Sequence, residues 1–185
     1  MRIRDPVAVL LMVAATGVGA QVANPDFDTG TAGWAFVLGS GGIVDWDAAV
    51  GDPALGSARA GNVFAGAHRD GWKQCVPFAA SDFVVSARAA SALQPGNSCR
   101  LRVDFIASAD CVDGTPIVLE GVAVNSRNDG TFESIGASGS LPNGVQAAAV
   151  FLEHVRSADA EPGNSFCHFD HVELDAGTIF TTTFE

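Results

Sequence analysis

The side chains that could support catalysis in this chain are histidines, serines, cysteines and paired carboxylates. The four histidines are His68, His154, His168 and His171. A nucleophilic mechanism needs one of them beside an activated serine or cysteine. The run 136–139 reads Gly-Ala-Ser-Gly, which lacks the spacing of a nucleophile elbow. We therefore expect no catalytic residues, although the scattered carboxylates leave a pair suited to glycoside hydrolysis as an open alternative.

His168, Asp170 and His171 lie close together in the sequence, as the ligands of a metal site often do. In an extended strand, however, successive side chains alternate between the two faces. His168 and His171 then fall on opposite faces of the strand. A metal ion shared by these two histidines is therefore not expected.

The charge balance of the chain bears on the class of partner. The 185 residues carry 21 acidic and 10 basic side chains, for a formal charge of −11, and Lys73 is the single lysine. Binding of phosphate groups needs clustered lysine and arginine, so nucleic acid is excluded as the expected partner. The acidity accounts for solubility, and it favours cation binding only where a specific site exists.

The N-terminal residues 1–20 have the pattern of a secretory signal peptide. Arg2 and Arg4 precede an apolar run at 7–15, and small residues follow at 18–20. An uncleaved anchor is the alternative, but the run is shorter than the roughly 20 residues that span a membrane. We expect a secreted or periplasmic monomer without a membrane span, with one domain at 21–176 and a short tail at 177–185.

The four cysteines are Cys75, Cys99, Cys111 and Cys167. In an exported protein an even number of cysteines favours disulfides, and no C-x2-C spacing indicates a metal cluster. The segment 100–106 alternates apolar and charged residues and predicts one extended strand. Its length would hold Cys99 and Cys111 more than about 20 Å apart, beyond the reach of a disulfide.

Short apolar segments separated by turn residues predict an all-β fold, a sandwich or a barrel. The run 147–156 is the one helix-friendly stretch, but it carries β-branched and aromatic residues between two glycine-containing turns, and we expect a strand there. The strands are expected near 35–38, 43–46, 57–64, 72–78, 83–90, 100–106, 117–124, 131–135, 145–155 and 166–174.

Short segments at both ends and in the middle of the chain resemble the galactose-binding-like jelly rolls. The likeness is to carbohydrate-binding modules of the kind attached to bacterial cellulases and xylanases. The residues that carry it are Asn24, Phe27, Asp28, Gly33, Trp34, Gln74, Val76, Asp170, Val172 and Leu174. The resemblance implies a two-sheet antiparallel jelly-roll β-sandwich with a non-catalytic, carbohydrate-binding role. The alternatives are a structural or adhesive cell-surface protein that binds another protein and, less favoured, a glycan-active hydrolase.

The resemblance also implies how the cysteines pair and where an ion binds. A jelly-roll order of the strands brings Cys99 to Cys167 and Cys75 to Cys111. A structural Ca²⁺ ion is implied between the N-terminal segment and the last strand, with Asp170 and Asp28 as its first ligands, because Ca²⁺ prefers oxygen donors. The plain alternative is that Asp28 is an ordinary turn residue and that Asp170 only accepts backbone hydrogen bonds.

Sugar recognition in such a fold uses a flat aromatic ring against the pyranose and polar side chains for the hydroxyls. Trp72 follows His68-Arg69-Asp70-Gly71, which we expect to form a polar loop ending in a turn glycine, and it is the predicted platform, with that loop supplying hydrogen bonds. Trp46 stands between two aspartates and is a second candidate. Trp34, in the N-terminal motif, is expected in the core together with Phe27, Val172 and Leu174.

Overall fold

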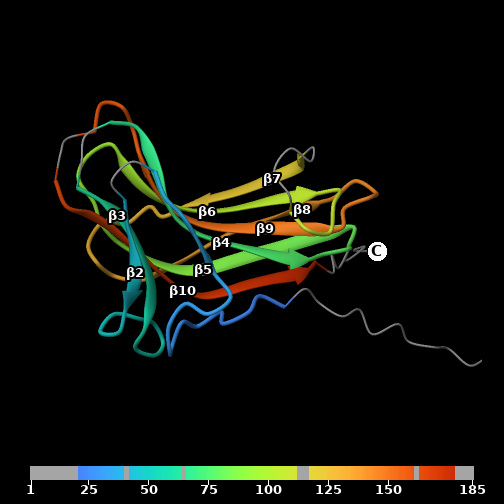
Figure 1. The fold of residues 1–185 in the computed structure, drawn as a ribbon, viewed down its shortest axis with the longest axis horizontal. Helices are drawn as coiled ribbons and strands as arrows, with labels where there is room; N and C mark the ends of the chain where they lie inside the picture. The colour runs from blue at the N-terminus through green and yellow to red at the C-terminus, as the bar shows by residue number, and fades with distance from the viewer. Residues whose placement is uncertain (1–20, 40–41, 64–65, 112–116, 161–162, 178–185) are drawn as a thin grey trace, which may run out of the picture.

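The protein is a sandwich of two antiparallel β-sheets (Figure 1), seen here in a computed structural model. The structure describes residues 21–39, 42–63, 66–111, 117–160 and 163–177. The expected signal peptide and the tail beyond Gly177 lie outside the described residues. Within the described ranges no helix is long and apolar enough to cross a membrane.

Five strands form each sheet, and all hydrogen-bonded neighbours are antiparallel. Sheet A contains, in spatial order, β1 (Ala35–Val37), β4 (His68–Pro77), β9 (Ala147–Arg156), β6 (Asn97–Ile106) and β7 (Ile117–Val124). Sheet B contains β2 (Gly42–Asp47), β3 (Ser57–Asn62), β10 (Ser165–Ala176), β5 (Asp82–Ala92) and β8 (Glu133–Ser140). The all-β, two-sheet jelly-roll prediction is confirmed, including the strand expected at 147–156.

The core lies between the inner faces of the two sheets. In β6 the apolar residues Leu101, Val103 and Phe105 are buried, while Arg100 and Arg102 point to the outer face. This alternation is what a strand with one buried face requires. Ring contacts such as Phe83 against Phe105, with centroids 4.5 Å apart, join the sheets.

A bulge in β10 controls which of its residues enter the core. Phe169 is fully buried, and the register with β5 then shifts between Asp170 and Glu173. His171 takes a positive φ of 47° at this point. Because one extra residue reverses the alternation, Val172 and Leu174 return to the core, at 1% and 2% exposure.

The N-terminal segment runs along β10, as the blue trace in Figure 1 shows, and the backbone N–H of Val172 donates to the carbonyl of Pro25 at 3.0 Å. Phe27 and Trp34 are buried, at 0% and 8% exposure, with ring centroids 5.3 Å apart. The predicted burial of Phe27, Trp34, Val172 and Leu174 is therefore confirmed.

Two disulfides fasten the sandwich, and both are the predicted pairs. Cys99 in β6 bonds to Cys167 in β10 with a Cα–Cα distance of 5.5 Å, so this bridge joins sheet A to sheet B through the core. Cys75 in β4 bonds to Cys111 with a Cα–Cα distance of 5.9 Å, which fastens the segment after β6 to the outer face of sheet A. No cysteine is left as a free thiol.

Candidate functional site

The polar run before Trp72 is the beginning of strand β4, where the sequence indicated a loop. His68, Asp70 and Trp72 share the inner face of β4, and Arg69 is exposed on the outer face. Gly71 lies inside the strand, opposite Glu153 of β9, where a Cβ would collide with the backbone of Leu152. The glycine that looked like a turn therefore allows two strands to approach closely.

The prediction that Trp72 is an exposed sugar platform is wrong. Its side chain is 1% exposed, its ring packs against Phe36 with centroids 4.7 Å apart, and its Nε1–H donates to the carbonyl of Arg59 at 3.2 Å. His68 and Asp70 are also enclosed, with 6% and 0% of their side chains exposed. Of the predicted run, Arg69 alone has a side chain that a polysaccharide could touch.

Two other aromatic rings reach solvent at one edge of the sandwich. Phe36 in β1 is 61% exposed and Trp46 in β2 is 38% exposed. These edge strands belong to different sheets, but β2 contacts β4, the neighbour of β1, so both lie on the same side of the sandwich. We call Phe36, Leu38 and Trp46 the aromatic edge; Leu38 is 59% exposed.

The two rings of the aromatic edge are held in place from behind. Buried Trp72 supports Phe36, and the indole N–H of Trp46 donates to the carbonyl of Phe27 at 2.7 Å. A fixed, exposed ring loses little side-chain entropy when a ligand stacks on it. Trp46 was predicted as a binding residue, whereas Phe36 was missed because its apolar strand carries no alternation that separates exposed from buried positions.

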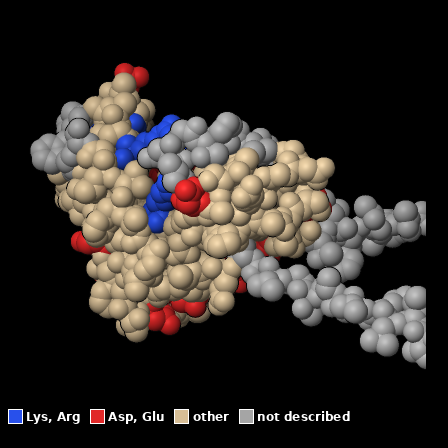
Figure 2. Space-filling view, turned by 45° about the vertical axis from the view of Figure 1, so that its right-hand side comes forward, with Lys and Arg blue, Asp and Glu red and all other residues tan. Residues whose placement is uncertain are grey.

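Charged side chains from neighbouring strands contact one another on the outer face of sheet A. Arg102 lies over the ring of Phe151, 3.8 Å from its centroid, and Lys73 approaches the same ring at 5.5 Å. Glu153 accepts hydrogen bonds from Arg100 at 2.6 Å and from Arg102 at 3.3 Å. On the face in Figure 2 basic side chains gather in one stripe, and most of the remaining described surface is uncharged.

Among the described residues, one serine contacts a histidine. Ser57 Oγ and His168 Nδ1 are 3.0 Å apart, between β3 and β10. Ser57 is fully buried, so its hydroxyl is not accessible to a substrate. Ser138, from the run considered for an elbow, lies exposed within β8 opposite Val84. Within the described ranges, the one serine hydroxyl that contacts a histidine is thus buried.

The predicted metal ligands Asp28 and Asp170 belong to an acidic cluster beside the N-terminal segment. Asp170 is 1% exposed, and its two carboxylate oxygens accept the backbone N–H groups of Asp52 at 2.7 Å and His171 at 2.8 Å. The pKa of Asp170 is raised to about 6: burial is the largest cause, the two hydrogen bonds act against it, and the charges of Asp26 and Asp28 add to it. Asp28 itself is exposed.

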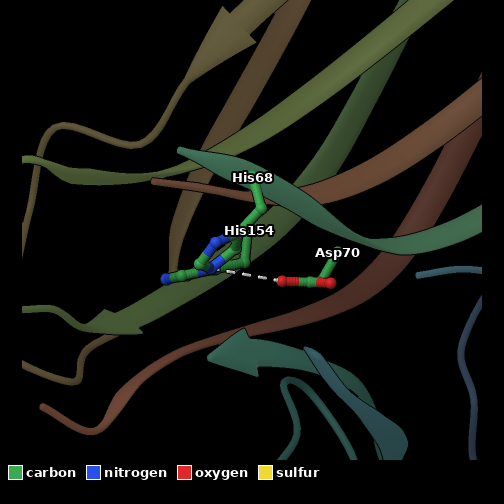
Figure 3. Close-up of side chains that lie close together, drawn as sticks. All are labelled: His68, Asp70 and His154. Carbon is green, nitrogen blue, oxygen red and sulfur yellow. Dashed lines mark ion pairs between the residues drawn. The ribbon is translucent and has the colours of Figure 1, made fainter. Parts of the chain in front are cut away.

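A second cluster of ionisable groups lies inside the sandwich (Figure 3). His154 and Asp70 face one another across β4 and β9, and His68 stands two residues before Asp70. The nearest ring nitrogen of His68 is 3.6 Å from Asp70 Oδ2. Burial lowers the pKa of His154 to about 4; the charge of Asp70 opposes this shift, and His68 and Arg156 add to it. The His154 imidazole is therefore neutral at pH 7.

Comparison with known proteins bears on the fold. No protein-family profile and no curated protein sequence matches the chain. Among solved structures, the CBM22-2 xylan-binding domain of Paenibacillus barcinonensis Xyn10C matches 83% of this chain and 98% of its own, with TM-score 0.57 and 12% identity. TmCBM61, solved with β-1,4-galactotriose, matches 84% of this chain and 97% of its own, with TM-score 0.54 and 12% identity.

A similar sandwich also occurs within a much longer chain. The enzymatically active domain of tailspike protein 4 from bacteriophage CBA120 matches 84% of this chain with TM-score 0.60 and 14% identity, but the match covers only 21% of the tailspike chain. The two carbohydrate-binding modules, in contrast, are matched along nearly their whole length. The comparisons therefore show that this chain shares its two-sheet jelly-roll fold with these modules.

Proposed function

We propose that the protein is a secreted, non-catalytic module that binds a β-linked polysaccharide. The observation that carries the proposal is the fold, which aligns with 97% and 98% of two modules described as binding galactotriose and xylan. The aromatic edge supplies the kind of surface such binding needs, because an exposed ring covers the apolar face of a pyranose. Two disulfide bonds, one in the core and one on the outer face of sheet A, fit an oxidising, extracellular environment.

Phe36 is the proposed main contact, and Trp46 the second. Among the described residues, several large apolar side chains are exposed to solvent, and Phe36 and Trp46 are the aromatic ones. Leu38 directly follows β1 and is also exposed, so it adds apolar surface next to Phe36. Arg69 is exposed on the outer face of sheet A, whereas Phe36 pairs with Trp72 of the inner face, so Arg69 does not belong to this contact surface.

A panel of immobilised polysaccharides and a glycan array test the proposed function. We expect retention of the protein by one or more β-linked glycans, including xylans or galactans. Release of reducing sugar during the incubation would identify a hydrolase and contradict the non-catalytic assignment. Binding to no glycan, combined with capture of a cell-surface protein, would support the adhesive alternative instead.

We also propose a structural Ca²⁺ ion at Asp170 and Asp28. Asp170 offers a buried carboxylate that already orders two backbone N–H groups and forms no ion pair with Lys or Arg among the described residues. Carboxylate and carbonyl oxygens are the donors that Ca²⁺ selects. Bound there, the ion would neutralise the acidic cluster and hold the N-terminal segment against β10.

We expect CaCl₂ to raise the melting temperature of chelator-treated protein, because the ion offsets repulsion between Asp26, Asp28 and Asp170. Differential scanning calorimetry with CaCl₂, MgCl₂ and EDTA measures the shift. Asp28→Asn removes an exposed ligand at little cost to folding and should reduce the calcium shift. Equal melting temperatures in calcium and in chelator would refute the ion but would leave the glycan proposal untouched.

A further inference from the structure

The side chains of His68, Asp70 and His154 converge from two neighbouring strands, as Figure 3 shows. We call them the inner cluster. The strand register fixes the arrangement: Asp70 pairs with His154, and both point between the sheets. Each residue offers one nitrogen or oxygen donor atom, and the three atoms lie within 4.8 Å of one another. The ring centroids of the two histidines are 6.4 Å apart.

The inner cluster leaves polar atoms unpaired where burial makes that costly. His154 is 0% exposed, and neither ring nitrogen has a hydrogen-bond partner among the described residues. The Nε2 atom of His68 is in the same condition. Each unsatisfied buried polar group costs about 1–3 kcal/mol, so native proteins rarely leave three together. A bound ligand that accepts an electron pair from one nitrogen of each imidazole would satisfy two of these three atoms.

Asp70, in contrast, is held by neighbours. Asn62 Nδ2 donates to its Oδ2 at 2.9 Å, and the backbone N–H of Gly39 donates to its Oδ1 at 2.7 Å. A carboxylate oxygen has two lone pairs, so each oxygen keeps one for another partner. Hydrogen bonds of this kind orient the ligands of metal sites. The carboxylate of Asp70 is therefore held in place by hydrogen bonds, whereas His68 Nε2 and both ring nitrogens of His154 have none among the described residues.

We propose that His68, Asp70 and His154 bind a divalent transition-metal ion of the Zn²⁺ class inside the sandwich. Two imidazole nitrogens and one carboxylate form a three-residue donor set suited to zinc, with a fourth position for water. Tetrahedral zinc with bonds near 2.1 Å needs donor atoms about 3.4 Å apart. The 3.6 Å separation between His68 and Asp70 is already close to this, and the 4.8 Å spread closes with small side-chain rotations.

The donor atoms and the nearby charges of the inner cluster determine which metal ions it favours. Nitrogen donors disfavour Ca²⁺ and Mg²⁺, which separates this site from the acidic cluster at Asp170. The buried guanidinium of Arg156, opposite His68 in the register, weakens cation binding and offsets part of the attraction of Asp70. His68, with 6% of its side chain exposed at the first position of β4, is the member nearest solvent.

The test uses untagged, EDTA-treated protein, so that no added histidines bind metal. All four cysteines are in disulfides, and thiolates do not compete. Equilibrium dialysis against ZnCl₂ with elemental analysis should give about one zinc ion per chain. Zinc, but not CaCl₂ at the same concentration, should also raise the melting temperature after the calcium site is saturated. Cobalt(II) should give the visible absorption of a four-coordinate nitrogen–oxygen site.

Variants locate the ion. His68→Gln and His154→Gln should each weaken zinc binding by about tenfold or more. His171→Gln is the matched control, because this exposed histidine lies beside Asp26 at 2.8 Å and Glu173 at 3.3 Å and is the obvious surface competitor. Zinc binding lost in His171→Gln but retained in His68→Gln would overturn the proposal. Absence of stoichiometric zinc in the wild type would overturn it as well. His68 stands at the first position of β4, so its variant remains informative if His154→Gln does not fold.

Discussion

Replacing Trp72 by alanine should destabilise the sandwich by about 3–5 kcal/mol, the usual cost of removing a large buried aromatic side chain. Trp72 is the largest fully buried side chain of the core. Its loss would leave a cavity beneath Phe36 and would leave the carbonyl of Arg59 without its indole donor. Urea denaturation followed by circular dichroism measures the change in the free energy of unfolding.

Phe36→Ala is the matched control for this prediction, because it removes the exposed ring of the same contact pair. With 61% of Phe36 exposed, the truncation should change stability by less than about 1 kcal/mol. A Trp72→Ala protein as stable as the wild type, yet unable to bind glycan, would show that Trp72 is a binding platform and that its burial here is wrong.

The disulfide between Cys99 and Cys167 should contribute about 4 kcal/mol to stability. It closes a loop with a sequence separation of 68 residues, and loop closure restricts the unfolded chain. Both cysteines are fully buried, so Cys99→Ala with Cys167→Ala also removes packing between the sheets. Thermal and urea unfolding of the double variant under non-reducing conditions would measure the loss.

The disulfide between Cys75 and Cys111 should contribute less to stability than the one between Cys99 and Cys167. Cys75→Ala with Cys111→Ala opens a shorter loop, with a separation of 36 residues, and Cys75 is exposed on the outer face of sheet A. We expect a smaller loss of stability from this double variant than from the first. The reverse order would mean that the outer segment after β6, and not the link between the sheets, limits unfolding.

Local patterns in the sequence located most strands and predicted the closure of the sandwich, but β4 begins at His68 rather than at 72 and β8 spans Glu133–Ser140 rather than 131–135. The alternation in β6 placed Leu101, Val103 and Phe105 inward, and it also excluded a bond between Cys99 and Cys111. The family-like segments at the two ends correctly placed Phe27 and Val172 in the core. These inferences depend on neighbours along one strand, or on a motif, and both are visible in a single sequence.

The binding residues and the inner cluster depend on information that local patterns lack. Gly71 looked like a turn because its close partner, the backbone of Leu152, comes from a distant strand. Reading 68–71 as a loop then turned Trp72 outward. Asp70 meets His154 only through the register of β4 with β9, and no spacing in the sequence announces that pairing. Exposure of Phe36 likewise follows from the edge position of β1.

The central claim is that the aromatic edge of this jelly roll binds glycan. Isothermal titration calorimetry with the best glycan from the array tests it most directly, on the wild type, Phe36→Ala and Val84→Ala. Val84 is the control because it is an apolar side chain, 46% exposed, in the opposite sheet. We predict about tenfold or greater loss of affinity for Phe36→Ala and none for Val84→Ala. Equal affinity of Phe36→Ala and the wild type would contradict the account.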